Sequence, residues 1–124
     1  MIVRTAFFEG VVRPGSEAAF ESLVEDTLIP LWRQFPGAED VSVLRPAAAD
    51  DGAPAYALVL ATRYPDLATM DKALSSDIRE ATREPSNILK SLFDGRVFHI
   101  TFNGADLLAK AGGSGAFLRN SAPA

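Results

Sequence analysis

Hydrophobic and polar positions follow two different periods along the first hundred residues of this chain. Stretches rich in β-branched and aromatic residues are typical of strands, and they alternate with stretches whose apolar residues recur every three or four positions, as in helices. Glycine, proline and adjacent aspartates separate the stretches and favour turns. In chain order, the pattern predicts a strand over residues 2–12, a helix over 16–35, strands over 41–45 and 55–64, a helical region over 65–93 and a strand over 96–102.

The first helix is expected to begin at Ser16 and to bend at Pro30. Ser16 is the expected N-cap, and Glu17 in the first turn suits the positive end of the helix dipole. Pro30 lacks a backbone donor and crowds the preceding turn, so we expect a kink there rather than an end. Apolar or small side chains continue at helical spacing through Phe20, Leu23, Val24, Thr27, Leu28, Leu31 and Phe35. The stripe centred on Thr27 and Leu31 is therefore predicted to face the core.

Turn and cap residues organise the rest of the pattern. The two middle strands flank the sequence Asp-Asp-Gly at 50–52, which tolerates the backbone angles of a tight turn, so these strands are expected to form a hairpin. Asp77 is the expected N-cap of a helix within the second helical region, with Glu80 three positions later completing a capping box. Pro85 is expected either to kink this helix or to begin a separate turn.

The predicted strands are apolar on both faces. A sheet with one solvated face shows a clean polar alternation, which is missing here. Helices can cover one face, and pairing of two sheets around a two-fold axis would bury the other. We therefore expect a homodimer through the sheet face; the alternative is that a long loop or the tail of the chain covers it. The alternating sets are Ile2, Ala6 and Phe8 against Val3, Thr5 and Phe7, and Tyr56, Leu58 and Leu60 against Ala57, Val59 and Ala61.

Composition narrows the class of protein. A chain of 124 residues with 48% hydrophobic and 23% charged residues is expected to form one domain, here 1–103, followed by a C-terminal extension at 104–124 that is partly flexible or docks on the dimer. The net charge of −4 comes without a basic stripe, which argues against a nucleic-acid partner. No apolar run approaches the ~20 residues that cross a bilayer, and the first residues lead into a strand rather than a signal peptide. We expect a cytoplasmic protein with no membrane partner.

Three features together resemble the dimeric α/β-barrel superfamily of ferredoxin-like domains. They are the order of elements, the kinked first helix ending in Leu-Trp-Arg-Gln-Phe-Pro-Gly at 31–37, and the aromatic last strand Arg-Val-Phe-His-Ile-Thr-Phe at 96–102. The resemblance spans about residues 1–103. Within the superfamily, the chain is similar to antibiotic-biosynthesis-monooxygenase-like and stress-responsive barrel proteins. It implies an α+β fold of β-α-β-β-α-β order, with a four-stranded antiparallel sheet that pairs with a second copy as a barrel. The superfamily also has haem-binding and isomerase branches, and no branch's site residues can be placed on this sequence.

His99 is the candidate catalytic residue, because it is the only side chain here whose ordinary pKa lies near neutrality. It shares a strand face with Val97 and Thr101. A single histidine without nearby carboxylates makes a poor site for zinc or non-haem iron, cysteine is absent, and nothing marks a porphyrin pocket. We therefore expect no metal and no cofactor. The alternative role for His99 is that of a hydrogen-bonded histidine in or beside the core.

Trp32 and Tyr56 are the candidate aromatic contacts for a ligand. Helical geometry places Trp32 on the flank of the apolar stripe and Ile29 on the opposite side, although a kink at Pro30 can shift that phase. A pocket between the first helix and the sheet would bring Trp32, Tyr56 and His99 together as an apolar wall with polar handles. Packing in the core is the alternative role for Trp32 and Ile29.

Arg63, beside Tyr64, is the candidate contact for an anionic group of a ligand. The alternative explanation for Arg63, as for Arg4 and Arg45, is a solvent-facing position in or at the end of a strand. The adjacent acidic pairs of the sequence do not converge as a catalytic dyad must, and no Gly-x-Ser-x-Gly motif indicates a serine hydrolase.

Three classes of function remain open, and the sequence leaves open whether the protein is an enzyme. The first is a dimer that binds a small apolar or aromatic molecule between sheet and helices. The second is a cofactor-independent monooxygenase acting on a phenolic or quinol-type substrate, with His99 or an arginine assisting proton transfer. The third is a structural or interaction module with a packed barrel. A deep apolar pocket with one or two polar groups would favour the first two.

Overall fold

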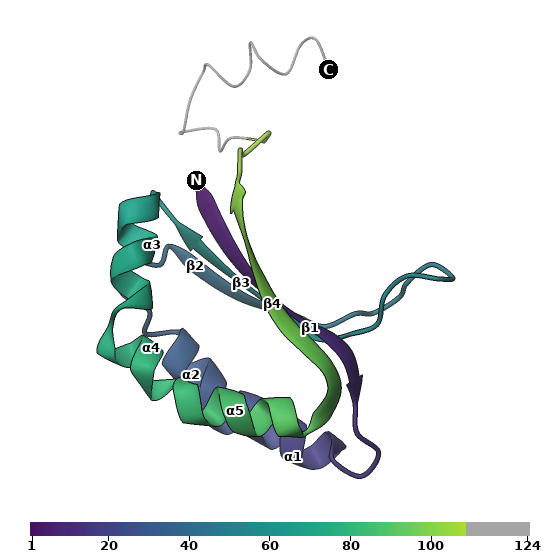
Figure 1. Cartoon of the computed structure of the whole chain (residues 1–124). Coiled ribbons are helices and arrows are strands. Elements are labelled where there is room, and N and C mark those ends of the chain that lie inside the picture. The colour runs from purple at the N-terminus through teal and green to yellow at the C-terminus, as the bar shows by residue number, and fades with distance from the viewer. Residues whose placement is uncertain (109–124) are drawn as a thin grey trace.

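The computed structural model describes residues 1–108 and confirms the predicted order of elements (Figure 1). Four antiparallel strands form one sheet in the order β2-β3-β1-β4, which is the expected ferredoxin-like α+β arrangement. The strands are β1 (Ile2–Val12), β2 (Asp40–Leu44), β3 (Tyr56–Tyr64) and β4 (Phe93–Asn103). The helices are α1 (Glu17–Leu23), the π-helical turn η1 (Val24–Leu28) and α2 (Ile29–Trp32), followed after the hairpin by α3 (Leu67–Leu74), α4 (Asp77–Ala81) and α5 (Arg83–Ser91).

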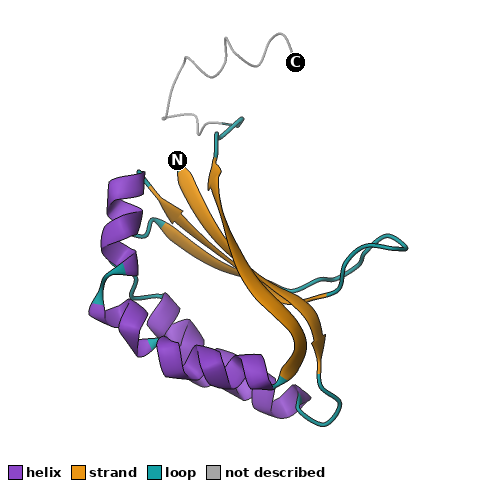
Figure 2. Ribbon diagram, in the orientation of Figure 1, coloured by secondary structure: helices purple, strands orange, loops and turns teal. Residues whose placement is uncertain are grey.

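The described helices all lie on one face of the sheet and leave the other face bare (Figure 2). β1 occupies the interior of the sheet, where Ala6 pairs with Leu60 of β3 on one side and with His99 of β4 on the other. Because side chains alternate along a strand, these three residues share the face that the helices cover. The register of the sheet therefore decides which residues of three strands meet beneath the helices.

A stripe spaced by four residues anchors the first helical segment to the sheet. An ordinary α-helix has 3.6 residues per turn, so a spacing of four drifts around its surface. The turn η1 closes with i→i+5 bonds, as between the Ile29 amide and the Val24 carbonyl, and its wider turn keeps the stripe on one face. The buried members of the stripe are Phe20, Val24, Leu28 and Trp32.

The position of this stripe shows that the predicted core face of the helix is wrong. Trp32 is only 4% exposed, whereas Leu31 and Thr27, the expected centre of the core face, are half-buried. Ile29 packs partly against the core instead of facing away from it. The irregularity expected at Pro30 occurs as the π-helical turn just before it, and we attribute it to the missing amide donor of that proline.

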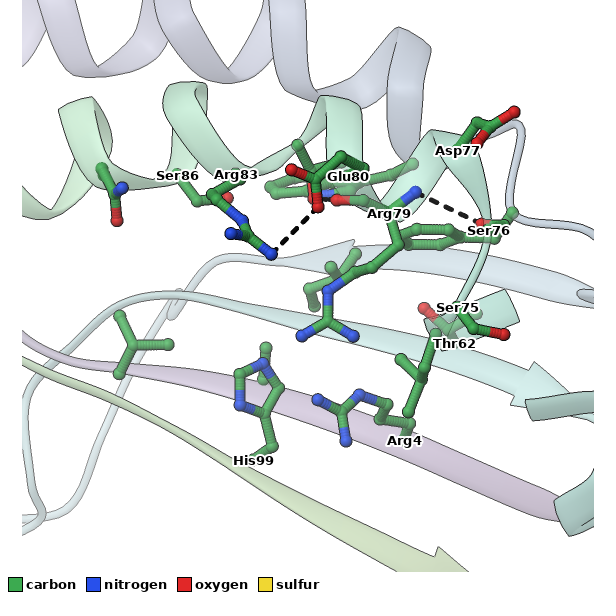
Figure 3. Close-up of a pocket in the computed structure, with 18 of the residues that line it drawn as sticks. Arg4, Thr62, Ser75, Ser76, Asp77, Arg79, Glu80, Arg83, Ser86 and His99 are labelled. Carbon is green, nitrogen blue, oxygen red and sulfur yellow. Dashed lines mark hydrogen bonds and ion pairs between the residues drawn. The ribbon is translucent and has the colours of Figure 1, made fainter. Parts of the chain in front are cut away.

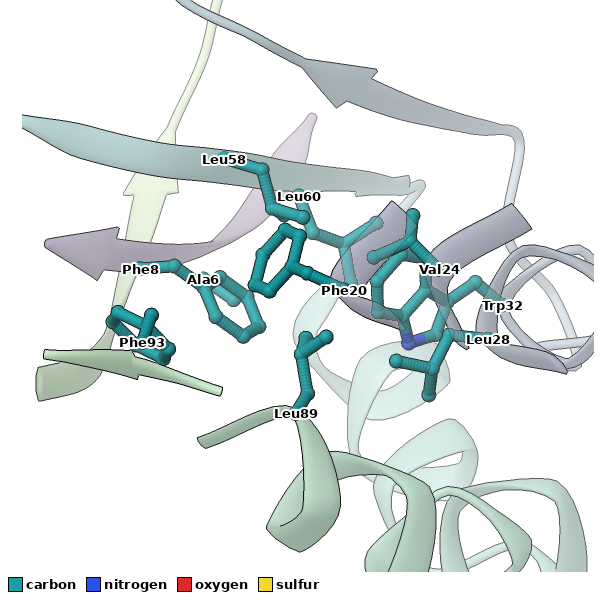
Figure 4. Packing of buried hydrophobic residues seen from close by; sticks show 10 residues of the cluster. All are labelled: Ala6, Phe8, Phe20, Val24, Leu28, Trp32, Leu58, Leu60, Leu89 and Phe93. Atoms are coloured by element: carbon teal, nitrogen blue, oxygen red, sulfur yellow. The ribbon is translucent and has the colours of Figure 1, made fainter. Parts of the chain in front are cut away.

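The core lies between this stripe and the sheet (Figure 4). Phe93 contacts Phe8 and Phe20 with ring centroids 5.9 Å and 6.3 Å apart, in tilted and edge-on orientations. Burial of each such side chain stabilises the fold by about 1.5–3 kcal/mol relative to exposure. The cluster consists of Ala6, Phe8, Phe20, Val24, Leu28, Trp32, Leu58, Leu60, Leu89 and Phe93.

The second helical region divides into three helices, and one predicted cap is wrong. Asp66 caps α3, with its carboxylate accepting a hydrogen bond of 2.8 Å from the Thr69 amide. Ser76, rather than Asp77, caps α4, because its hydroxyl accepts from the Arg79 amide at 3.3 Å. Asp77 is instead the first helical residue. Pro85 lies in the first turn of α5, where backbone amides make no hydrogen bond within the helix. Its missing amide therefore breaks no helical hydrogen bond, and Pro85 marks the start of a new helix rather than a kink.

The bare face of the sheet is apolar, as the strand pattern predicted. Phe7 stacks on Phe98 at a centroid distance of 5.0 Å, and the Arg96 guanidinium lies 4.8 Å from the centroid of the Phe98 ring. Ile100 and Phe102 on the same face of β4 are 41% and 43% exposed. We call this surface the outer face.

The chain beyond β4 stays close to the start of β1. The Gly104 amide donates to the Met1 carbonyl at 2.9 Å, and Arg63 binds the carboxylate of Asp106 at 2.6 Å. The rest of the predicted C-terminal extension, residues 109–124, lies outside the described residues. Within the described part of the chain, no helix is both long enough and apolar enough to cross a membrane.

Candidate functional site

A cavity of about 430 Å³ lies between the helix-facing side of the sheet and helices α2, α4 and α5 (Figure 3). One part of its wall is apolar and the other carries cationic and hydroxyl groups. The short side chains of Ala6 and Thr62 line the sheet side and fill little of the space beneath the helices. The apolar side chains that line the cavity are Ala6, Phe8, Trp32, Phe35, Leu60, Leu74 and Val97. Such a division suits a ligand with an apolar body and a polar end.

His99 stands on β4 at the boundary between the two parts of the wall. Its side chain is exposed to the open cavity, and its ring nitrogens have no hydrogen-bond partner among residues 1–108. Partial loss of hydration, together with the positive charges of Arg4, Arg79 and Lys90, lowers the pKa of His99 from 6.5 to about 4. The imidazole is therefore neutral at pH 7 and offers one donor and one acceptor to a ligand.

Arg4 and Arg79 reach the cavity from opposite sides. Arg4 rises from the centre of the sheet, and Arg79 extends from α4 toward it, so that both side chains point to the same space as His99 (Figure 3). Both arginines are half-buried. Burial and the charge of Arg79 lower the pKa of Arg4, which is partly offset by the neighbouring phenol of Tyr64. Burial in turn raises the pKa of Tyr64, so that its phenol is neutral at pH 7.

The acidic residues beside the cavity do not neutralise this pair. Glu80 binds Arg83 at 2.9 Å across one helical turn. Asp77 is exposed at the start of α4, where its charge faces the positive end of the helix. Neither Arg4 nor Arg79 makes an ion pair through its guanidinium within the described residues.

The structure brings together two of the four predicted site residues. Trp32 and His99 both line the cavity. Tyr56 lies on the outer face, where its ring centroid is 5.7 Å from that of Phe7. The predicted grouping of Trp32, Tyr56 and His99 in one pocket is therefore corrected. Phe8 pairs with Leu58 but Glu9 pairs with Tyr56, so an extra residue of β3 lies in this bulge and turns Tyr56 to the other face.

Arg63 also lies on the outer side of the sheet, away from the cavity. Its guanidinium binds Asp106 at 2.6 Å and approaches Glu39 at 3.6 Å. The hydrogen bond that the Arg63 guanidinium donates to Asp106 is the main cause of the raised pKa of Arg63. The Arg63 guanidinium is thus already paired with two carboxylates. A contact between Arg63 and a ligand stays a prediction.

Arg4 and Arg79 are the cavity residues that the sequence analysis missed. Arg4 could have been found, because it occupies the same alternating set as Ile2 and Ala6 and must face the helices when they do. Arg79 carries no comparable signal. It lies on a helix of five residues whose direction depends on the caps at both ends.

Comparisons with known proteins bear on the fold. No family model matches the sequence, and no curated protein matches it either. An ethyl tert-butyl ether D (EthD) family protein from Bacillus halodurans is similar in structure, with a TM-score of 0.70 and 21% sequence identity over 85% of this chain and 99% of that one. The chain has the fold of EthD-family and antibiotic-biosynthesis-monooxygenase-like proteins. This is the ferredoxin-like α+β fold that the resemblance predicted.

Two further solved structures with this fold are described as oxygenases. An antibiotic biosynthesis monooxygenase has a TM-score of 0.58 and 14% identity over 86% of this chain and all of its own. SnoaB from Streptomyces nogalater, described as a cofactor-independent oxygenase, has a TM-score of 0.58 and 20% identity over 88% of this chain and 96% of its own. At such low identity the likeness concerns the fold alone.

Proposed function

We propose that the protein binds a small molecule with an apolar or aromatic body in the cavity between sheet and helices. The observation that supports this most directly is the apolar wall around Trp32 within a cavity of about 430 Å³, a size in the range of small-molecule sites. His99 and the hydroxyl groups of the opposite wall provide the polar contacts that orient a ligand. A packed barrel without a pocket, the third class of function, is disfavoured by this cavity.

Trp32 provides a direct test, since it is the only tryptophan of the chain. Titration with 2-naphthol should change the fluorescence of Trp32 in a saturable way, and calorimetry should give the same dissociation constant. Native mass spectrometry of the purified protein would show whether a ligand accompanies it. No fluorescence change and no heat up to millimolar 2-naphthol would contradict the proposal.

The proposed functional unit is a homodimer paired through the outer face. The support is the row of exposed apolar side chains there, with Ile100 and Phe102 more than 40% exposed on a face that no described helix covers. Burial of such a surface against a second copy would remove apolar area from water. A stable monomer in sedimentation at micromolar concentration would contradict this pairing.

A cofactor-independent monooxygenase is the second candidate, and the neutral His99 beside two arginines favours it. A phenol bound there would be acidified by the positive charges, so that even the weak base His99 could take its proton. The resulting carbanion-like substrate would add O₂ to form a hydroperoxide at a carbon that still carries a hydrogen. Breaking of that C–H bond and of the O–O bond would give the new carbonyl and release water, so that the substrate supplies every electron that O₂ takes up. Oxygen consumption with an anthrone-type substrate tests this, with loss of turnover expected in His99→Gln. Unchanged turnover in that variant would remove His99 from the mechanism.

A further inference from the structure

Most arginines in the described part of the chain are paired with carboxylates, and the exceptions are informative. Among residues 1–108, five arginines form ion pairs, namely Arg13, Arg45, Arg63, Arg83 and Arg96. Arg4, Arg33 and Arg79 form none. Arg33 is exposed and hydrated by solvent, whereas Arg4 and Arg79 are half-buried and line the same cavity. Arg4 and Arg79 are therefore half-buried arginines without an ion pair among the described residues, whereas Arg63, which is also half-buried, is paired with Asp106.

From this arrangement we propose that the ligand of the cavity is an organic acid, whose anionic group is held between Arg4 and Arg79. This inference rests on the proposed binding function and specifies its ligand. Guanidinium groups present donors in a planar fork that fits a carboxylate or phosphate oxyanion, and two of them from opposite walls fix both its position and its orientation.

The charge balance around the cavity supports an anion. The chain as a whole carries a net charge of −4, yet Arg4, Arg79 and Lys90 are cationic groups of the cavity wall without an ion pair among the described residues. Asp77 opposes them, while Glu80 is already bound to Arg83. Like charges that face each other across a confined space repel, so a bound anion would relieve this repulsion.

The position of the apolar wall defines the rest of the ligand. Trp32 and Phe35 line the same cavity as the arginines, so we expect an aromatic ring system to contact them while its acidic group reaches Arg4. Neutral His99, with one donor and one acceptor, can accept a hydrogen bond from a hydroxyl group on the same ligand. The favoured ligand class is thus an aromatic acid.

The test compares an acid with its neutral analogue in calorimetry. The wild-type protein should bind 2-naphthoate at least about tenfold more tightly than 2-naphthamide, which has nearly the same shape without the charge. Arg79→Gln and Arg4→Lys should reduce this preference to about threefold or less. Arg33→Gln, which removes the same charge from an exposed site outside the cavity, should keep it. 2-Naphthyl phosphate and inorganic phosphate, measured in parallel, distinguish a phosphate-bearing ligand from a carboxylate.

Thermal unfolding separates a binding role from a structural one. Arg79→Gln should unfold at the wild-type temperature or above it without ligand, because it removes a like-charge repulsion, and should lose the stabilisation that 2-naphthoate gives the wild type. Equal binding of 2-naphthoate and 2-naphthamide would overturn the anion site and leave the proposed function standing. Binding of neither would overturn both. A preference that survives in Arg79→Gln and Arg4→Lys would assign the anion to other groups.

Discussion

Ala6 lies directly opposite His99 in the β1–β4 pair, so one of the smallest side chains of the sheet stands beside the histidine of the cavity. Both residues line the same space, and a larger residue at position 6 would project into it. The size of the cavity thus depends on the small side chain of Ala6, whereas the hydrophobic pattern of the sequence shows only that this position is apolar.

Ala6→Leu is expected to weaken the binding of 2-naphthol at least about tenfold, because the added carbons occupy ligand volume. Overpacking should cost about 1–3 kcal/mol in the free energy of unfolding. Calorimetry and urea denaturation measure the two effects. Ala18→Leu on the exposed surface of α1 is the matched control and should change neither. Wild-type affinity in Ala6→Leu would mean that the ligand binds elsewhere.

His99 should titrate near pH 4 in the folded protein, which NMR can follow without ambiguity because the chain has one histidine. The charges that face it are those of Arg4, Arg79 and Lys90. Its folded-state pKa lies below the ordinary 6.5, so between these values the unfolded chain binds more protons and stability falls as the pH falls.

The size of this effect is limited by the exposure of the His99 side chain, and we expect about 1 kcal/mol. Urea denaturation at pH 7 and pH 4.5 measures it. His99→Gln should lose this part of the pH dependence. A titration of His99 near pH 6.5 would show that the ring is fully hydrated and that the three cations do not act on it.

Phe102→Glu should convert the proposed homodimer to a monomer, because it places a charge in the apolar outer face. Ile88→Glu on α5 is the matched control, since Ile88 is 46% exposed and Phe102 is 43% exposed. Sedimentation equilibrium of both variants and of the wild type decides between them. If Ile88→Glu dissociates the dimer and Phe102→Glu does not, the subunits pair through the helices.

Gly10 and Gly95 lie opposite each other in the antiparallel pair of β1 and β4, and neither position has room for a side chain. A Cβ on Gly10 would collide with the Asp94 carbonyl, and one on Gly95 would collide with the Glu9 carbonyl. Gly10→Ala should therefore cost more than about 2 kcal/mol in the free energy of unfolding. Gly52→Ala, where φ is also positive but no atom lies within 4 Å, should cost about 1 kcal/mol. Equal losses in a denaturant titration would contradict a steric cause.

Local patterns were sufficient for the elements of the fold. The strand predicted over residues 2–12 agrees with β1, and the hairpin of β2 and β3 forms as expected. Burial of one or both faces of a strand or helix imposes a hydrophobic period on residues that are close in sequence. This period can therefore be recognised without knowledge of the rest of the chain. Trp32 and His99 could be proposed as site residues for the related reason that their side-chain chemistry is rare in this sequence.

The composition of the cavity could not be predicted, since it depends on register and helix phase. An extra residue in β3 moves Tyr56 to the outer face, and the π-helical turn brings Trp32 into the core. Arg4 and Arg79 meet although they are far apart in the chain. The sequence by itself determined the order of the elements and the apolar character of both sheet faces, because these follow from local periodicity. Tertiary structure decided which charged side chains share a confined space, because that depends on contacts between distant segments.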